Sequence, residues 1–157
     1  MHQYLKFAIK QAHNHEYDHN IEYKLCAVIV KGGNVISIGF NQRKTNAFVE
    51  YYTDKIRGGG RNYCLSTHAE MHAVALARAS TDLRGCKIFV ARIRPAESPT
   101  GSSTGLSRPC PICINVLNAY GIKKAYYTID DLNYGVMKIV EHEITDKVFS
   151  KYNKEQM

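Results

Sequence analysis

The chain has 157 residues, of which 45% are hydrophobic and 22% are charged. These proportions fit a single folded domain over residues 1–157, and they exclude a disordered tail, a collagen-like repeat and a coiled coil. No apolar stretch approaches the roughly 20 residues that a membrane span needs, and residues 1–10 hold no apolar secretory core. We therefore expect a cytoplasmic protein without a membrane partner.

Charge and cysteine content narrow the classes of partner. Lys and Arg total 21 against 14 for Asp and Glu, which gives a formal net charge of +7 with His neutral. This excess favours anionic partners such as nucleotides or nucleic acid, although a solvated basic surface that aids solubility explains it equally well. The five cysteines are an odd number. Without a secretory signal, a close cysteine pair indicates a metal or catalytic site rather than a disulfide framework.

The first elements are predicted to be a helix and a hairpin. Residues 2–15 carry apolar side chains at the spacing of one helical face, namely Leu5, Ala8, Ile9 and Ala12. Two apolar runs over 25–30 and 35–40, separated by a Gly-Gly-Asn break, predict a hairpin. Because the first run is apolar throughout, we expect that strand to be buried on both faces.

The middle of the chain is predicted to alternate strands and helices. Residues 41–63 are expected to form one long loop. The elements expected after it are a helix over 67–79, a strand over 87–93, a loop over 95–108, a helix over 109–121 and a strand over 123–129. This alternation indicates an α/β fold in which part of the sheet is parallel.

The last strand is expected over 138–144. Only eight residues, 130–137, separate it from the preceding strand, and a parallel crossover needs a dozen or more. The strand should therefore return antiparallel. Leu132, Val136 and Val140 also fit a helical face, and Gly135 is the objection to that alternative.

Two motifs carry the chemistry. His68-Ala69-Glu70 heads one predicted helix, and Pro-Cys-Pro-Ile-Cys over 109–113 heads the next. Cys110 and Cys113 lie three residues apart, so both sulfurs project from one side of a first helical turn, where the helix dipole favours thiolates. With His68 they offer one nitrogen and two sulfurs to zinc. Three protein ligands leave the fourth tetrahedral position for water, as in a catalytic site.

Each motif alone has a simpler explanation. Thr67 and Glu70 match a capping box, and an isolated Cys-x-x-Cys could be a redox pair or half of a structural zinc site. Together, with a strand between them, they match the pattern of zinc deaminases. In that pattern Glu70 is the catalytic acid and base, moving protons from the attacking water to the ring and the departing amine.

The segment from Cys26 to Ile129 therefore resembles the cytidine and deoxycytidylate deaminase superfamily of zinc-dependent deaminases. The resemblance implies a three-layer α/β fold with a mixed five-stranded sheet flanked by helices. The sheet would consist of a hairpin, then parallel strands, with the last strand antiparallel. Members often assemble, so a homo-oligomer is expected.

The resemblance also implies the roles of individual residues. One zinc ion per chain would be held by His68, Cys110 and Cys113. Asn41, at the end of Gly39-Phe40-Asn41, would line the pocket and touch the substrate sugar, although an asparagine in a turn is common. Ala69 is assigned to the substrate-binding residues with Asn41.

The expected substrate is a cytosine-type nucleoside or nucleotide (cytidine, deoxycytidine or dCMP), converted to its uracil form with release of ammonia. An antiparallel last strand resembles the free-cytidine branch of the superfamily. His72 stands where many deoxycytidylate deaminases have Asn, which weakens a direct assignment to dCMP.

The alternative is a base deaminase acting on cytosine or adenine in single-stranded DNA or RNA, including tRNA. Basic and aromatic residues alternate near the expected pocket, as they do on stacking platforms for single strands. The basic residues are Arg43, Lys44, Lys55, Arg57, Arg61, Arg92 and Arg94, and the aromatic residues are Phe48, Tyr51, Tyr52 and Tyr63. Solvated loops with packed aromatics explain this pattern at least as well.

A third hypothesis is a zinc-stapled binding module without catalysis. It requires a fourth protein ligand, which Cys64, Cys86 or a nearby histidine would supply. Otherwise Cys26, Cys64 and Cys86 are expected to be small buried hydrophobic residues.

Overall fold

The computed structural model describes residues 1–19, 21–45, 47–57, 66–94 and 103–139. Its helices are α1 Gln3–Asn14, α2 Ala47–Arg57, α3 Ala69–Ala77 and α4 Pro111–Ala119. Its strands are β1 Lys24–Lys31, β2 Asn34–Phe40, β3 Lys87–Ile93, β4 Thr104–Gly105, β5 Lys124–Thr128 and β6 Tyr134–Lys138. Within these ranges no helix is long and apolar enough to cross a membrane.

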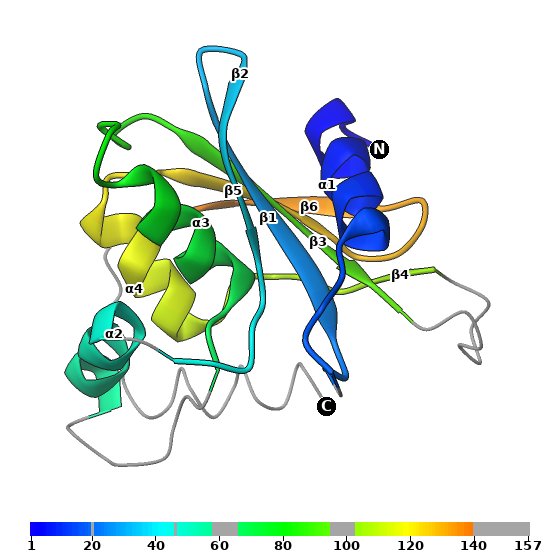
Figure 1. The fold of residues 1–157 in the computed structure, drawn as a ribbon. Helices are drawn as coiled ribbons and strands as arrows, with labels where there is room; N and C mark the ends of the chain where they lie inside the picture. Colours follow the sequence, from blue (N-terminus) through cyan, green and yellow to red (C-terminus); the bar gives the residue numbers. More distant parts are fainter. Residues whose placement is uncertain (20, 46, 58–65, 95–102, 140–157) are drawn as a thin grey trace.

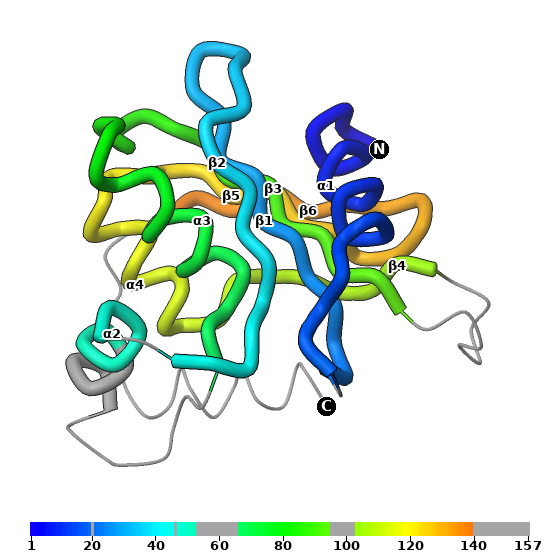
Figure 2. The backbone as a smooth tube through the Cα atoms, viewed as in Figure 1, coloured from blue at the N-terminus to red at the C-terminus, as the bar shows by residue number. Residues whose placement is uncertain are grey.

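The sheet has the strand order β2-β1-β3-β5-β6, and the two-residue strand β4 pairs with β3 beside this path. β1 pairs antiparallel with both β2 and β3, β3 pairs parallel with β5, and β5 pairs antiparallel with β6. Figure 2 follows the backbone through the β1–β2 hairpin, which projects past the rest of the sheet. The mixed sheet with an antiparallel last strand is as expected, and β4 adds a short sixth strand.

Helices cover both faces of the sheet and create two cores (Figure 1). α1 lies on one face, and α3 and α4 lie on the other, with α2 beside α4. The alternating side chains of β1 contribute to both cores, because Ala27 and Ile29 pack toward α3 and α4 while Cys26 and Val28 pack toward α1. The predicted burial of this strand on both faces is confirmed.

The prediction of a loop throughout residues 41–63 is wrong, because α2 occupies part of that range. Val49 and Tyr52 are buried, and the ring of Phe48 packs 5.1 Å from that of Tyr52 and 6.1 Å from that of Tyr120. Apolar burial at this helical spacing stabilises α2 against α4. Tyr52 is therefore a core residue and Phe48 is partly buried against that core. Tyr51 is 59% exposed, and Tyr63 lies outside the described residues.

The last strand begins earlier than predicted, at Tyr134 instead of 138. Asp130 makes this possible, because its carboxylate accepts hydrogen bonds from the backbone N–H groups of Leu132 and Asn133 and closes a tight turn. Leu132 is 83% exposed at this turn, so the alternative helical face is wrong where the structure describes it. The predicted residues 140–144 lie outside the described ranges.

The start of α4 also differs from the prediction. The helix begins at Pro111 rather than at Pro109, and Cys110 is its N-cap residue. Proline suits this first helical position, because the N–H that it lacks would have no partner in the helix. The helix ends at Ala119 rather than at 121, and Gly121, the predicted stop signal, follows it with a φ of +78°.

β2 approaches α3 so closely that glycine is required at Gly39. A Cβ there would collide with the backbone nitrogen of Ala73 and the carbonyl oxygen of Ala69. Two hydrogen bonds hold the same contact, from the Ser37 hydroxyl to the Ala73 carbonyl at 2.8 Å and from the Phe40 N–H to His72 Nδ1 at 3.0 Å. β2 therefore fixes the helix that begins with the His-x-Glu motif.

We expect Gly39→Ala to lower the free energy of unfolding by about 1–3 kcal/mol, because the new methyl group overpacks against helix backbone that cannot move aside. Urea denaturation measures this change. Gly33→Asn is the matched control, since Gly33 has a φ of +79° with open space around it and asparagine tolerates that conformation. Equal losses in both variants would show that the contact with α3 is not the cause.

Candidate active site

A cavity of about 390 Å³ lies where the N-terminal ends of α3 and α4 meet β1 and β3. Its lining comes from the start of β1, the residues after β2, the first turn of α3, the end of β3 and the segment between β4 and α4. Six of the residues singled out from the sequence line it together: Asn41, His68, Ala69, Glu70, Arg92 and Cys110. Cys113 is fully buried and is not among the lining residues.

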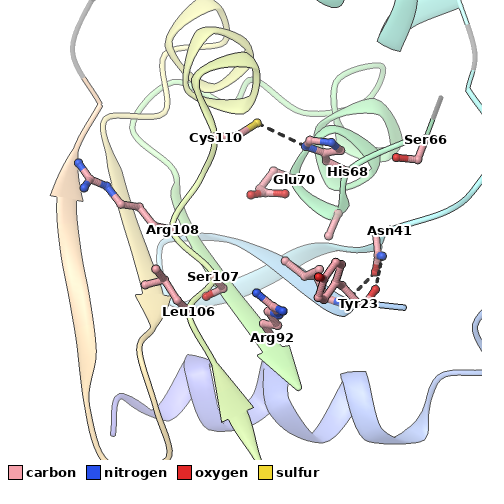
Figure 3. Close-up of a pocket in the computed structure, with 12 residues that line it drawn as sticks. Tyr23, Asn41, Ser66, His68, Glu70, Arg92, Leu106, Ser107, Arg108 and Cys110 are labelled. Atoms are coloured by element: carbon pink, nitrogen blue, oxygen red, sulfur yellow. Dashed lines mark hydrogen bonds between the residues drawn. The ribbon is translucent and has the colours of Figure 1, made fainter. Parts of the chain in front are cut away.

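The ligand atoms of His68, Cys110 and Cys113 converge on one point, and Figure 3 shows the sulfur of Cys110 facing the imidazole of His68. His68 is the N-cap residue of α3, and the two cysteines belong to the N-cap and first turn of α4. Each sulfur lies 3.4 Å from His68 Nδ1, and the three ligand atoms lie within 4.8 Å of one another. Tetrahedral zinc, with Zn–S near 2.3 Å and Zn–N near 2.0–2.1 Å, requires an S···N separation of about 3.5 Å. The donor set therefore fits a zinc ion.

The electrostatics of Cys110 also favour a cation. Its hydrogen bond with the Cys113 side chain, together with the nearby imidazole of His68, holds the pKa of the Cys110 thiol well below its usual range. The Cys110 sulfur also accepts a hydrogen bond from the backbone N–H of Cys113 at 3.5 Å. A thiolate is the form of cysteine that binds a metal. The lowered pKa of Cys110 therefore favours metal binding at the start of α4.

Glu70 lies beside these ligands without belonging to the set of three converging atoms. Its side chain is only 4% exposed, and burial raises the pKa of its carboxyl to about 7 against the opposing effect of the His68 imidazole. The capping-box alternative is wrong. α3 has His68 as its N-cap, and the Thr67 hydroxyl donates instead to the carbonyl of Lys44 at 2.6 Å.

Asn41 and Ala69 line the cavity, as expected of substrate-binding residues. The carboxamide of Asn41 also holds the start of β1, because its oxygen accepts from the Leu25 N–H at 2.8 Å and its nitrogen donates to the Tyr23 carbonyl. Ala69 is the first residue of α3, so its N–H is one of the first-turn donors that have no partner within the helix.

The remaining cysteines give no fourth ligand among the residues that the structure describes. Cys26 is buried within β1, and the thiol of buried Cys86 faces the Asp82 carbonyl at 4.0 Å. Both match the expectation of small buried hydrophobic residues. Cys64 lies outside the described ranges.

The loop predicted over 95–108 was expected to flank the pocket, and its described end does form a wall of the cavity through Leu106, Ser107 and Arg108, which the sequence did not single out. Ser107 is 3% exposed, and its hydroxyl donates to the Val90 carbonyl at 2.6 Å and accepts from the Thr128 N–H at 2.8 Å. These bonds attach the segment to β3 and β5. Proximity in sequence to Cys110 was the one available signal for this wall.

Asp131 holds the start of β4 in place. Its carboxylate accepts hydrogen bonds from the backbone N–H groups and hydroxyls of both Ser103 and Thr104. These bonds hold the pKa of the Asp131 carboxyl well below its usual range, and the hydrogen bond from the Thr104 hydroxyl has the largest effect. The ionised form therefore stabilises the fold above about pH 4. This contribution is lost as the pH falls from there toward the lowered folded-state pKa.

Asp131→Asn is expected to lower the melting temperature near neutral pH. The difference from the wild type should narrow as the pH falls below about 4, because the wild-type carboxylate then becomes protonated. Thermal unfolding followed by circular dichroism over this pH range measures the difference. Other acidic groups titrate in both proteins, so a constant difference at every pH would contradict the role of the Asp131 charge.

Two solved structures show the same fold. A dCMP deaminase from cyanophage S-TIM5, in complex with dCMP and dUMP, is 21% identical, with a TM-score of 0.51 and coverage of 94% of this chain and 88% of that one. A cytidine deaminase from Burkholderia pseudomallei is 22% identical, with a TM-score of 0.59 and coverage of 88% and 93%. No curated protein sequence matches the chain significantly.

The family model described as the cytidine and deoxycytidylate deaminase zinc-binding region matches residues 1–129. That range includes both motifs, every strand from β1 to β5 and the cavity that they form. The chain therefore belongs to the cytidine and deoxycytidylate deaminase family with a zinc-binding region.

Proposed function

We propose that this protein is a zinc-dependent hydrolytic deaminase that converts a cytosine nucleoside or nucleotide to the uracil form and releases ammonia. The observation that carries this proposal is the convergence of His68, Cys110 and Cys113 beside the buried carboxyl of Glu70 in one cavity. Family membership supports the same reaction class.

The proposed reaction needs residues that bind a zinc ion and a residue that transfers protons. A zinc ion held by His68, Cys110 and Cys113 would supply a nucleophile from water at neutral pH. The Glu70 carboxylate would take the proton of that water and deliver it to N3 of the cytosine ring as C4 is attacked. It would then carry the second proton to the departing amine, so that ammonia leaves and a carbonyl remains at C4.

Asn41 and Ala69 would position the substrate. The Asn41 carboxamide is held by backbone groups of β1, so it presents a fixed polar edge to the sugar. The Ala69 N–H, at the start of α3, would donate to the carbonyl of the base. Groups held in place by a sheet and a helix start lose little freedom when substrate binds.

A substrate panel on purified, zinc-loaded protein tests the proposal. Cytidine, deoxycytidine and dCMP are offered beside a single-stranded oligonucleotide that contains cytosine and adenine, and products are identified by mass spectrometry and ammonia release. Deamination of at least one cytosine monomer is expected. Activity on the oligonucleotide alone would overturn this assignment in favour of a nucleic-acid base deaminase.

A further inference from the structure

Arg92 is the cation that the sheet itself places in the cavity. It belongs to β3, not to a loop, and lines the same cavity as Glu70 and His68. Figure 3 shows its guanidinium beside Tyr23, across the cavity from His68 and Cys110. A ligand that reached from the catalytic carboxyl to this wall would meet a positive charge at its far end.

The guanidinium is oriented by an aromatic face. Its central carbon lies 4.2 Å from the centre of the Tyr23 ring. A cation at this distance is attracted to the face of the ring, and a guanidinium carries its N–H donors in its own plane. The fork of an arginine matches two oxygens of a phosphate in that geometry.

The backbone around Arg92 is anchored on two sides. The Arg92 N–H donates to the Thr128 hydroxyl at 3.2 Å, and this fully buried hydroxyl donates in turn to the Gly105 carbonyl at 2.7 Å. A Cβ on Gly105 would lie 3.5 Å from Arg92 Cδ and 2.7 Å from Arg94 Nε. The glycine in β4 thus leaves room for the side chain of Arg94, whereas the distance to Arg92 is that of an ordinary contact.

The charges of the described cavity residues favour an anion at this wall. Arg92 and Arg108 are its basic residues, and Glu70, next to the proposed ion site, is its one carboxylate. A cytosine ring with C4 at Glu70 would direct its sugar and any 5′-phosphate away from the metal ligands. Tyr52 is buried in the core and Phe48 is partly buried against it, so these two rings are less available as platforms for a strand of nucleic acid, which favours a single phosphate.

We propose that Arg92 is a specificity-determining residue that binds the 5′-phosphate of a cytosine mononucleotide, so that the monophosphate is preferred to the free nucleoside. This inference rests on the proposed deaminase function and names its substrate class.

The test compares kcat/KM for dCMP with that for deoxycytidine, and for CMP with that for cytidine. The wild type should prefer the phosphorylated member of a pair. Arg92→Gln should lower kcat/KM for that nucleotide by about 10- to 100-fold, the range for lost charge-assisted hydrogen bonds, and lower kcat/KM for the nucleoside much less. Arg92→Lys keeps the positive charge but not the two-pronged guanidinium, so its kcat/KM for the nucleotide should lie between those of the wild type and Arg92→Gln.

Arg84→Gln is the matched control, because Arg84 is exposed and paired with Asp82 before β3 begins, at the end of the strand opposite Arg92. Arg84→Gln should leave kcat/KM unchanged for both the nucleotide and the nucleoside. A second measurement does not depend on turnover: in isothermal titration calorimetry, Arg92→Gln should weaken dUMP binding without weakening deoxyuridine binding.

Three results would overturn the inference. They are a wild type that does not prefer the monophosphate, equal losses for nucleotide and nucleoside in Arg92→Gln, and an effect confined to a single-stranded oligonucleotide. If no cytosine monomer is deaminated while dUMP binding still depends on Arg92, the proposed reaction fails and the phosphate site stands. The two proposals are thus tested separately.

Discussion

Glu70→Gln is expected to lower kcat by about 10²- to 10⁴-fold, the range for loss of a general acid and base. Glutamine has nearly the shape of glutamate, so it fits the same buried position, where the side chain is 4% exposed. It cannot accept the proton of an attacking water. Steady-state kinetics on the best monomer substrate, with zinc content measured on the same sample, checks this result.

Glu50→Gln provides the control for Glu70→Gln. Glu50 is an exposed residue in the first turn of α2 and lies outside the cavity. It should retain full activity. A Glu70→Gln protein that binds zinc and turns over substrate at the wild-type rate would remove Glu70 from the mechanism.

Cys113→Ser is expected to abolish zinc binding and, with it, activity. Cys113 is fully buried, and its sulfur lies 3.4 Å from His68 Nδ1. A serine hydroxyl is not ionised at neutral pH, so the substitution removes one of three protein ligands. Loss of a group that only hydrogen-bonds to a metal ligand already costs about 10- to 100-fold in metal affinity, and we expect a loss above about 100-fold here. Chelator competition measures the affinity.

The same variant should melt at a lower temperature in the presence of zinc. A ligand at a concentration of 100 times its Kd stabilises the folded state by about 2.7 kcal/mol, and a variant that does not bind loses that contribution. Treatment of the wild type with a chelator should reproduce the loss of stability.

Cys86→Ser is the matched control for Cys113→Ser, because it makes the same atomic change at another buried thiol. The Cys86 sulfur faces the Asp82 carbonyl, away from the three converging ligands. The variant should retain its zinc. Equal zinc loss in both serine variants would indicate general destabilisation rather than loss of a ligand.

The sequence indicated His68, Cys110 and Cys113 as a group, and the structure places their ligand atoms together, because each of the two motifs is a local feature. Cys110 and Cys113 are separated by less than one helical turn, and His68 and Glu70 by two residues. Helix starts hold such side chains in a geometry that spacing alone defines. The direction of β6 was predictable for a similar reason, because the length of chain before it limits how it can return.

The features that the sequence did not predict depend on contacts between distant residues. α2 is stabilised where Phe48 and Tyr52 pack near Tyr120, about 70 positions later in the chain, a contact that composition does not reveal. The cavity wall depends on β4, in which Gly105 pairs with Arg92. A polar-rich segment without apolar periodicity gives no signal for such a pairing.

X-ray absorption spectroscopy at the zinc edge tests the central claim most directly. The account predicts two sulfur neighbours at about 2.3 Å, one imidazole nitrogen at about 2.0–2.1 Å and one further light atom from solvent. Three or four sulfur neighbours, or a shell without sulfur, would contradict it.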